Sequence, residues 1–215
     1  MAGKKLRIEV VSDPVCPWCY VGKRRLESAL ARRPGLEVDL QWRPFQLNPD
    51  MPRAGRNRRE YYREKFGAET AENLLAGMQQ TGEEVGIQFG SDPDAVAPNT
   101  LSAHVLMQWA DADPGVDADE LAEKLFAAHH VACEDIGDHA VLARIAGEVG
   151  MDESEVATRL AAGVDEEAVE AKIAHAVSLG VSGVPFFIVN GKYGISGAQP
   201  PEVLVDAFDQ IAAED

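Results

Sequence analysis

The stretch Ser12-Asp13-Pro14-Val15-Cys16-Pro17-Trp18-Cys19 joins two segments with different hydrophobic periods. Residues 6–12 alternate and are rich in Ile and Val, which predicts a strand that Asp13-Pro14 ends. From Cys16 onward the apolar residues have helical spacing until Pro34-Gly35 stops the pattern, and residues 36–42 alternate again. Strand, helix and strand are therefore expected in this order, with the two cysteines where the helix begins.

The two cysteines have the spacing of a redox pair. Cys16 and Cys19 are about one helical turn apart, so both side chains lie on the same side of the first turn, close enough for a disulfide. Cys16 falls at the helix start, where free backbone N–H groups and the helix dipole stabilise a thiolate. Cys19 lies on the apolar face with Leu26, whereas Lys23 lies off it. We expect Cys16 to be the exposed, attacking thiol and Cys19 the buried, resolving thiol.

A zinc site is the main alternative for a close cysteine pair. Zinc binds about four ligands, and the chain otherwise offers Cys133 and five scattered histidines without a second C-x-x-C or H-x-x-x-H spacing. Cys133 follows His129-His130, which makes it a candidate disulfide relay or metal ligand, although a lone thiol at a helix end is the simpler interpretation. His104 is interpreted as a packed or capping side chain. No metal is expected.

Helical patterns dominate the middle of the chain, after a turn-rich linker at residues 44–52. They cover residues 60–84, 101–112, 119–131, 138–149, 153–160 and 165–179. Strand patterns return at residues 186–189 and 192–195 around Asn190-Gly191, the pair that a type I′ hairpin turn favours, and a last helix is expected over 203–212. The sequence therefore predicts an α/β domain of residues 1–55 and 164–215, interrupted by an all-helical insertion at 56–163.

The composition limits the kinds of partner. A formal net charge of -16 argues against binding to nucleic acid or to anionic membranes, because both would be repelled. Residues 1–7 are charged and lack the apolar core of a secretory signal, so we expect a cytoplasmic protein. Recurrent acidic clusters favour a host with high internal salt, since screening relieves self-repulsion; an acidic but ordinary mesophilic protein is the alternative.

Beyond the cysteine pair, several motifs occur in order along nearly the whole chain, and together they resemble the FrnE-like branch of the DsbA family. They are Ser12–Lys23 with its Cys-Pro-Trp-Cys core, Trp42-Arg43-Pro44-Phe45-Gln46-Leu47, Pro98-Asn99-Thr100, Ile136-Gly137-Asp138, Val181-Ser182-Gly183-Val184-Pro185-Phe186-Phe187 and Tyr193-Gly194-Ile195-Ser196-Gly197-Ala198-Gln199. The set is far more specific than C-x-x-C alone.

The resemblance implies a thioredoxin fold with a helical insertion and a cis-proline at Pro185. Val184 would then present its backbone to an extended substrate beside Cys16, with Pro17 and Trp18 at the same substrate-binding surface. The implied activity is thiol-disulfide exchange with protein or small-thiol substrates. No bound cofactor is implied, and glutathione is the candidate redox co-substrate.

Two other functions stay open at this stage. The family's near relatives include glutathione-dependent isomerases and transferases of the 2-hydroxychromene-2-carboxylate isomerase type, which typically carry a serine in place of the first cysteine. The complete Cys16/Cys19 pair favours disulfide exchange over that activity. A holdase that binds unfolded chains through an apolar groove is the third hypothesis. Trp18 and Phe45 are candidates to line an apolar substrate groove by the active site, although large aromatic side chains are more often core residues. Neither the direction of exchange nor its potential follows from the sequence.

Overall fold

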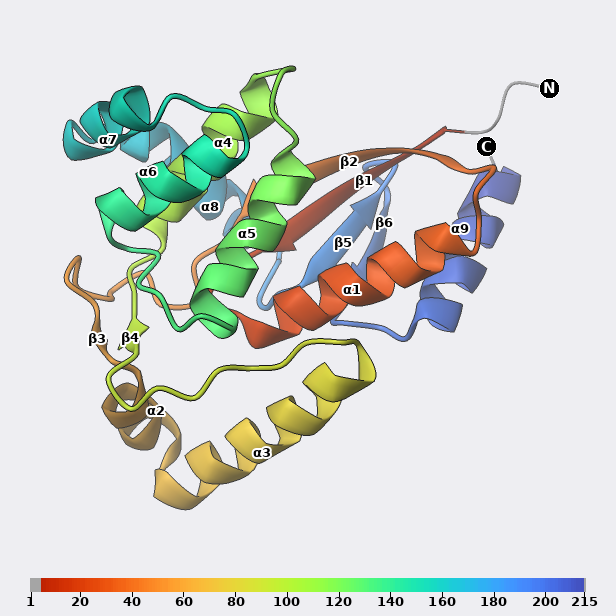
Figure 1. Ribbon diagram of the computed structural model, residues 1–215. Coiled ribbons are helices and arrows are strands. Elements are labelled where there is room, and N and C mark those ends of the chain that lie inside the picture. Colours follow the sequence, from red (N-terminus) through yellow and green to blue (C-terminus); the bar gives the residue numbers. More distant parts are fainter. Residues whose placement is uncertain (1–4, 215) are drawn as a thin grey trace.

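A four-stranded sheet in the order β2-β1-β5-β6 forms the centre of the computed structural model, which describes residues 5–214 (Figure 1). β1 (Lys5–Ser12) lies parallel to β2 (Glu37–Pro44) and antiparallel to β5 (Phe186–Val189), which pairs with β6 (Tyr193–Ser196). The parallel pair needs a crossover, which α1 (Pro17–Ala31) provides. The two ends of the chain thus share one sheet, as the sequence predicts.

Side-chain alternation divides the sheet into two buried faces. Leu6, Ile8 and Val10 of β1 belong to the main core, which also includes residues of α1 and of α9 (Pro201–Glu214). Val11 points to the other face, where it packs with Ala176 of α8 (Glu166–Ser178). In Figure 1, α1 and α9 lie together in front of the sheet. This layered α/β arrangement confirms the predicted fold class, and it places the start of α1 at one end of β1.

The region between β2 and α8 is mainly helical. It contains α2 (Arg58–Phe66), α3 (Ala68–Glu84), α4 (Leu101–Ala112), α5 (Ala118–His130), α6 (His139–Glu148) and α7 (Glu153–Ala161). Asp117, Asp138 and Asp152 cap α5, α6 and α7 through their carboxylates. The same region also contains two antiparallel strands of two residues each, β3 (Arg56–Asn57) and β4 (Val96–Ala97). No alternating sequence pattern predicts them.

Two turns depend on residues with positive φ. The single helix expected over residues 60–84 is wrong: Gly67, at a φ of 82°, separates α2 from α3. The expected β hairpin is confirmed, because Asn190 and Gly191 have φ angles of 52° and 65° between β5 and β6. The insertion boundaries at residues 56 and 163 remain a prediction, and residues 1–4 of the predicted first segment lie outside the described residues.

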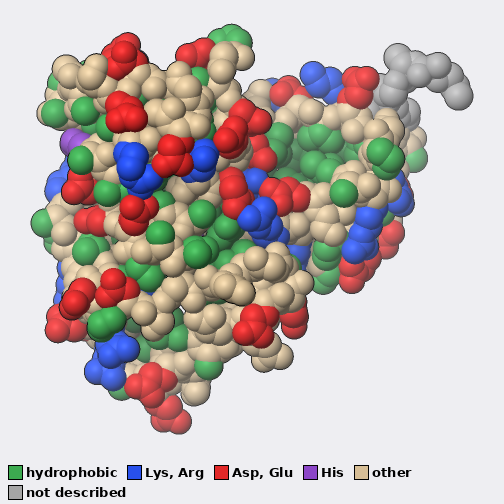
Figure 2. Space-filling model, in the orientation of Figure 1, with side chains coloured by type: hydrophobic (Ala, Val, Ile, Leu, Met, Phe, Trp, Pro, Cys, Tyr) green, Lys and Arg blue, Asp and Glu red, His purple; other side chains and the backbone are tan. Residues whose placement is uncertain are grey.

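The surface carries many acidic side chains. Figure 2 shows Asp and Glu spread over one whole face of the molecule, with Lys and Arg between them. Across residues 5–214, none of the helices is both long and apolar enough to cross a bilayer.

Candidate active site

The active-site loop leads directly from β1 into α1. Cys16 is the residue before the first helical position, which Pro17 occupies, and its φ and ψ of -85° and 111° are extended. The backbone N–H of Cys16 donates to the carbonyl of Asp13 at 2.9 Å, and the N–H of Cys19 donates to the carbonyl of Cys16 at 3.0 Å. Cys16 therefore lies at the positive end of the α1 dipole, as its sequence position predicts.

Both thiols are buried, so the expectation that Cys16 is exposed is wrong. Cys19 is 1% exposed, but Cys16 is also only 4% exposed. The Sγ of Cys16 lies 3.6 Å from the carbonyl oxygen of Val184, and α2 brings Tyr62 within electrostatic reach of it. Burial raises the pKa of Tyr62, and the charge on Cys16 raises it further while Arg58 opposes the shift. Val184 and Tyr62 are distant in the chain from Cys16, and a local helical pattern does not reveal that they lie near its thiol.

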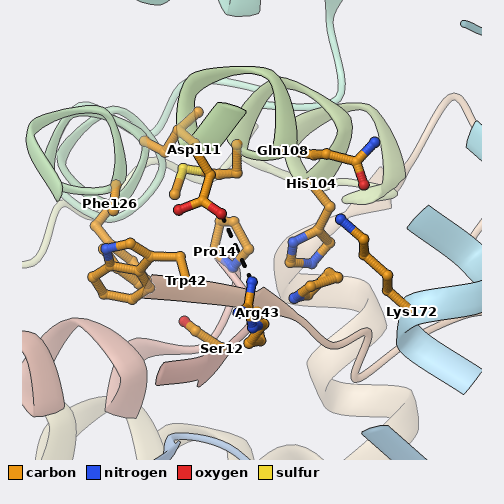
Figure 3. A pocket seen from close by; sticks show the side chains of 13 residues that line it. Ser12, Pro14, Trp42, Arg43, His104, Gln108, Asp111, Phe126 and Lys172 are labelled. Carbon is orange, nitrogen blue, oxygen red and sulfur yellow. Dashed lines mark ion pairs between the residues drawn. The ribbon is translucent and has the colours of Figure 1, made fainter. Parts of the chain in front are cut away.

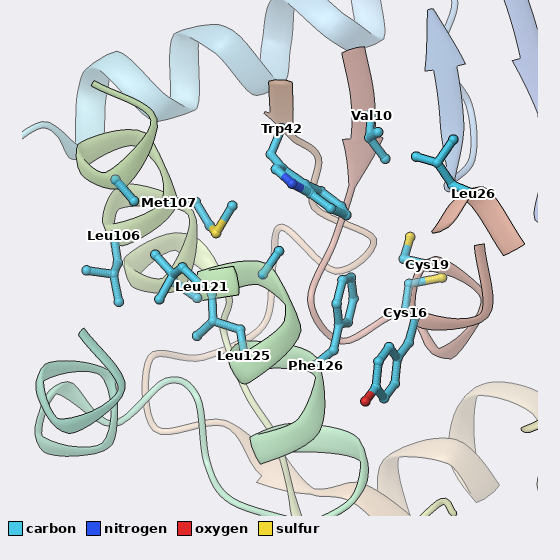
Figure 4. Close-up of a cluster of buried hydrophobic side chains, with 14 of the residues drawn as sticks. Val10, Cys16, Cys19, Leu26, Trp42, Leu106, Met107, Leu121, Leu125 and Phe126 are labelled. Atoms are coloured by element: carbon cyan, nitrogen blue, oxygen red, sulfur yellow. The ribbon is translucent and has the colours of Figure 1, made fainter. Parts of the chain in front are cut away.

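The environment of Cys19 favours its protonated form. Burial raises the pKa of the Cys19 thiol well above its usual value, and its hydrogen bond with Cys16 and the charge there raise it further. The Ser12 side chain and the Asp13 backbone act in the opposite direction. The two thiols are free in the structure and belong to the edge of the main core beside Leu26 (Figure 4). The surroundings of Cys19 thus favour a protonated thiol one helical turn beyond Cys16.

The predicted substrate-binding residues come together around Cys16. The Val184–Pro185 peptide bond is cis, and Pro185 is buried, whereas Val184 is half-buried. α1 approaches Pro185 closely because Gly22 lacks a side chain: a Cβ there would lie 2.9 Å from the Pro185 Cγ. Pro17 is half-buried, and Trp18 is 43% exposed beside the thiols. Phe45, by contrast, is a core residue packed with Val11, so it lines no open groove.

Asp13 anchors the active-site loop, a role that its turn-forming position did not reveal. Its side chain is buried, and its carboxylate accepts hydrogen bonds from the N–H of Leu47 at 2.8 Å and of Val15 at 3.4 Å. His104 of α4 lies 3.6 Å from the same carboxylate and 2.8 Å from the carbonyl oxygen of Phe45. The packed position of His104 agrees with its interpretation from sequence, and it ties the loop to the helical region.

α5 supports the loop and α1 from the other side. Tyr20 stacks on Phe126 with ring centroids 5.2 Å apart. Phe126 also stands edge-on to Trp42, with ring centroids 6.0 Å apart, and Figure 4 shows these two side chains. The Nε2 of His130 lies 2.9 Å from the carbonyl oxygen of Pro14. Burial lowers the pKa of His129 to about 4, and it lowers that of His130 well below its usual value. Both histidines are thus uncharged structural groups at neutral pH.

Cys133 and its neighbouring histidines do not converge. The Sγ of Cys133 lies 3.5 Å from a guanidinium nitrogen of Arg58, and its own φ of 59° is positive. His130 instead contacts the active-site loop. Within residues 5–214, the structure contains no group of three or more His, Cys, Asp or Glu side chains that could hold a metal ion.

Known proteins resemble this chain over nearly its whole length. The model of the DSBA-like thioredoxin domain matches residues 7–209. The chain belongs to the DsbA family. A solved structure, the probable DsbA oxidoreductase SCO1869 from Streptomyces coelicolor, shares 31% identity over 98% of this chain and 91% of its own, with a TM-score of 0.85. The family membership confirms the resemblance inferred from the motifs.

Two more distant relatives extend the comparison. The uncharacterized protein YwbO of Bacillus subtilis (strain 168) is 27% identical over 94% of this chain and 96% of its own length. A 2-hydroxychromene-2-carboxylate isomerase shares 17% identity over 97% of each chain, with a TM-score of 0.67, so it shows that this isomerase has the same fold. DsbA-family membership supports thiol-disulfide chemistry as the general activity, with thiols or disulfides as the substrates.

Proposed function

We propose that the protein is a thiol-disulfide oxidoreductase in which Cys16 exchanges disulfides with protein or small-thiol substrates and Cys19 completes the exchange. The observation that carries this proposal is the arrangement of the pair: Cys16 at the start of α1, where the helix dipole stabilises a thiolate, and Cys19 one turn further on with a raised pKa. A serine at either position could not form the internal disulfide.

In the direction that reduces the substrate and oxidises the enzyme, the reaction has two steps. The Cys16 thiolate attacks a substrate disulfide, forms a mixed disulfide and releases one substrate thiolate. The Cys19 thiolate then attacks the Cys16 sulfur and releases the second substrate thiolate, which leaves Cys16 and Cys19 joined. The reverse sequence oxidises a substrate dithiol and leaves the enzyme reduced.

The backbone beside Cys16 provides a surface for an extended substrate. The carbonyl oxygen of Val184 lies 3.6 Å from the Cys16 Sγ, so a substrate sulfur bonded to Cys16 would lie next to this strand-like segment. Trp18 offers an exposed apolar ring on the helix side. These contacts suit a peptide or a small thiol alike, and they support the proposal that Pro17, Trp18, Val184 and Pro185 form the binding surface.

A redox titration of the purified protein against defined glutathione ratios tests the proposal. We expect one reversible two-electron couple with a potential between about -270 mV, the thioredoxin value, and about -120 mV, the DsbA value. Cys16→Ser should remove both the couple and the reduction of insulin disulfides. An irreversible pair, or insulin reduction that survives Cys16→Ser, would contradict the proposal. Turnover of a glutathione-dependent isomerase substrate that persists in Cys19→Ser would support isomerase chemistry instead.

A further inference from the structure

A basic segment interrupts the otherwise acidic chain at residues 53–65. It carries six Lys or Arg and two Glu, a net charge of +4 in a chain whose net charge is -16. The segment covers β3 and nearly all of α2, which lie beyond the end of the sheet where α1 begins (Figure 1). Figure 2 shows Lys and Arg side chains where Figure 1 places α2. This β3–α2 surface thus has a charge opposite to that of the rest of the chain.

Half of the cations on the β3–α2 surface are not neutralised by a carboxylate. Three of the six form ion pairs, namely Arg53 with Glu166, Arg56 with Glu64 and Arg63 with Glu72. Within residues 5–214, no carboxylate lies within ion-pair distance of Arg58, Arg59 or Lys65. Arg59 and Lys65 are exposed, and Arg58 is half-buried. Positive charge that is left unpaired in this way attracts anions over about a Debye length, roughly 8–10 Å at ordinary salt.

Lys65 lines a hollow of about 340 Å³ in this surface, together with Asn48, Arg56 and Tyr61. The Lys65 Nζ donates to the Oδ1 of Asn48 at 2.6 Å and to the hydroxyl of Tyr61 at 3.1 Å, both of them neutral groups. An ammonium group has three N–H donors, so one remains for a ligand. The Arg56 Cζ and the Lys65 Nζ lie 5.5 and 5.4 Å from the centre of the Tyr61 ring, which holds both cations in place. Asp50 is the one carboxylate among the lining residues, so the hollow keeps a net positive charge.

Hydrogen bonds connect the β3–α2 surface to the active-site loop. Leu47, which lines the hollow, donates its N–H to the Asp13 carboxylate at 2.8 Å, and the N–H of Cys16 donates to the Asp13 carbonyl at 2.9 Å. At the other end of the surface, a guanidinium nitrogen of Arg58 lies 3.5 Å from the Sγ of Cys133, just after α5, the helix that contacts the loop. Neither redox cysteine lines the hollow. A group bound there therefore belongs to a part of the substrate some residues away from its reacting sulfur.

We propose that the β3–α2 surface binds acidic side chains of a protein substrate whose cysteine exchanges with Cys16. The inference rests on the proposed function and names its substrate class. An extended peptide advances about 3.3–3.6 Å per residue, so an acidic residue a few positions from the substrate cysteine reaches the hollow. The carboxylates of glutathione lie within one residue of its sulfur and would stay at the loop. Attraction at this one surface orients the substrate, because the rest of the acidic chain repels it.

Two peptides that differ only in charge test the inference. Each has one cysteine in a disulfide with a chromogenic aromatic thiol, and either Glu or Gln at the third to sixth positions on both sides of it. Attack by the Cys16 thiolate on the peptide sulfur releases the chromophore as a thiolate, and the rate against peptide concentration gives a dissociation constant and a maximal rate. We expect the Glu peptide to bind about tenfold more tightly at low salt, as two or three exposed ion pairs imply, with an unchanged maximal rate. Molar KCl should reduce this preference to about twofold.

Three variants make the result specific. Lys65→Gln should lower the preference for the Glu peptide about two- to fivefold, and Lys65→Arg, which retains the charge, should restore it. Arg33→Gln is the matched control, because it removes a cation that pairs with Asp209 beyond the far end of α1, and it should keep the wild-type preference.

The outcomes separate this inference from the proposed function. Equal dissociation constants for the two peptides in the wild type would overturn the inference and leave exchange at Cys16 intact. If Lys65→Gln weakened the binding of glutathione disulfide as much as that of the Glu peptide, the surface would serve glutathione, and a protein substrate would be ruled out as its specific partner. Failure to release the chromophore from either peptide would overturn the proposed function itself.

Discussion

α5 and α3 both lie against α1 but differ in how firmly they are attached (Figure 1). α5 buries seven residues, and its Phe126 and His130 reach the redox helix and the active-site loop. α3 buries three, Ala71, Met78 and Gly82, and leaves Leu74 and Leu75 nearly half exposed. The predicted insertion therefore has one part that fixes the redox helix and another that is only loosely attached beside it.

Charge reinforces the difference between the two helices. Lys23 of α1 is 3% exposed and contacts three carboxylates, those of Glu27, Asp119 and Glu123, of which the last two belong to α5. On α3, Glu72 pairs with Arg63 of α2 at 3.3 Å, with both side chains more than half exposed. A buried charge such as that of Lys23 would destabilise the fold without its carboxylate partners, whereas an exposed ion pair contributes only about 0–1 kcal/mol to stability. Contacts to α5 should dominate the stability of the site.

The largest expected effect comes from truncating the aromatic contact. Phe126→Ala removes a side chain that is 1% exposed and stacked on Tyr20, and it should lower the free energy of unfolding by about 3–5 kcal/mol. Leu75→Ala on α3 is the matched control and should change it by less than about 0.5 kcal/mol, because Leu75 is 48% exposed. Urea denaturation measures both. Similar losses in the two variants would remove the distinction between the helices.

The second-largest effect should come from acid, which lowers the stability of the protein through the buried histidines of α5. His129 has its pKa lowered to about 4 by burial, while the unfolded residue takes up a proton near its usual value of 6.5. The stability it contributes is therefore complete above pH 6.5 and is lost as pH falls from there toward 4. Between pH 6.5 and 5 the loss from His129 is about 2 kcal/mol, and His130 acts in the same direction.

Variants at two histidines separate this effect from general acid sensitivity. His129→Leu should flatten the slope of unfolding free energy against pH between 6.5 and 5. His175→Gln, on an exposed position of α8, should leave that slope unchanged. Urea denaturation at a series of pH values measures the slope. A wild-type protein with constant stability over this range would show that the histidines are not buried in their neutral form.

Periodicity in the sequence was sufficient to locate most elements. The ranges expected for β1, α1, α4 to α9 and the hairpin agree with the structure within a few residues, because apolar spacing and capping residues act locally. The Cys16/Cys19 pair and its position at a helix start are confirmed for the same reason. The break at Gly67 and the short β3–β4 pair were exceptions, since a lone glycine inside a helical pattern gives no sign of whether it will break the helix and a two-residue strand is too short to alternate.

Contacts between distant segments could not be predicted in this way. Lys23 lies off the apolar face of α1, yet α5 buries it by supplying carboxylates from about 100 residues further along the chain. The Cys16 thiol contacts the carbonyl of Val184, and Asp13 meets His104, through the packing of separate elements. Ser12, Trp42 and Gln108 likewise belong to three different elements and line one pocket only because these elements pack together (Figure 3). Local patterns determine elements, but docking determines which side chains meet.

Two helical glycines offer a smaller test of the same contrast. In Gly22→Ala the new Cβ would lie 2.9 Å from the Pro185 Cγ, so we expect a loss of about 1–3 kcal/mol in unfolding free energy. Gly77→Ala on α3 meets nothing within 4 Å and should gain about 0.5–1 kcal/mol through helix propensity. Urea denaturation measures both changes. A destabilised Gly77→Ala would mean that α3 is packed against something on that side.

Salt should have the smallest effect on stability, and it should affect the ion pairs of α3 more than those of α5. Screening relieves the repulsion of a chain with net charge -16, so molar KCl should raise the melting temperature by about 2–4 °C, the equivalent of about 1 kcal/mol. The same screening weakens the exposed Arg63–Glu72 pair and leaves the buried Lys23 largely unaffected. When KCl is raised to molar concentration, amide hydrogen exchange should therefore stay slow in α5. In α3 it should be no slower than at low salt. A melting temperature that is independent of KCl would contradict the expected adaptation to a salty interior.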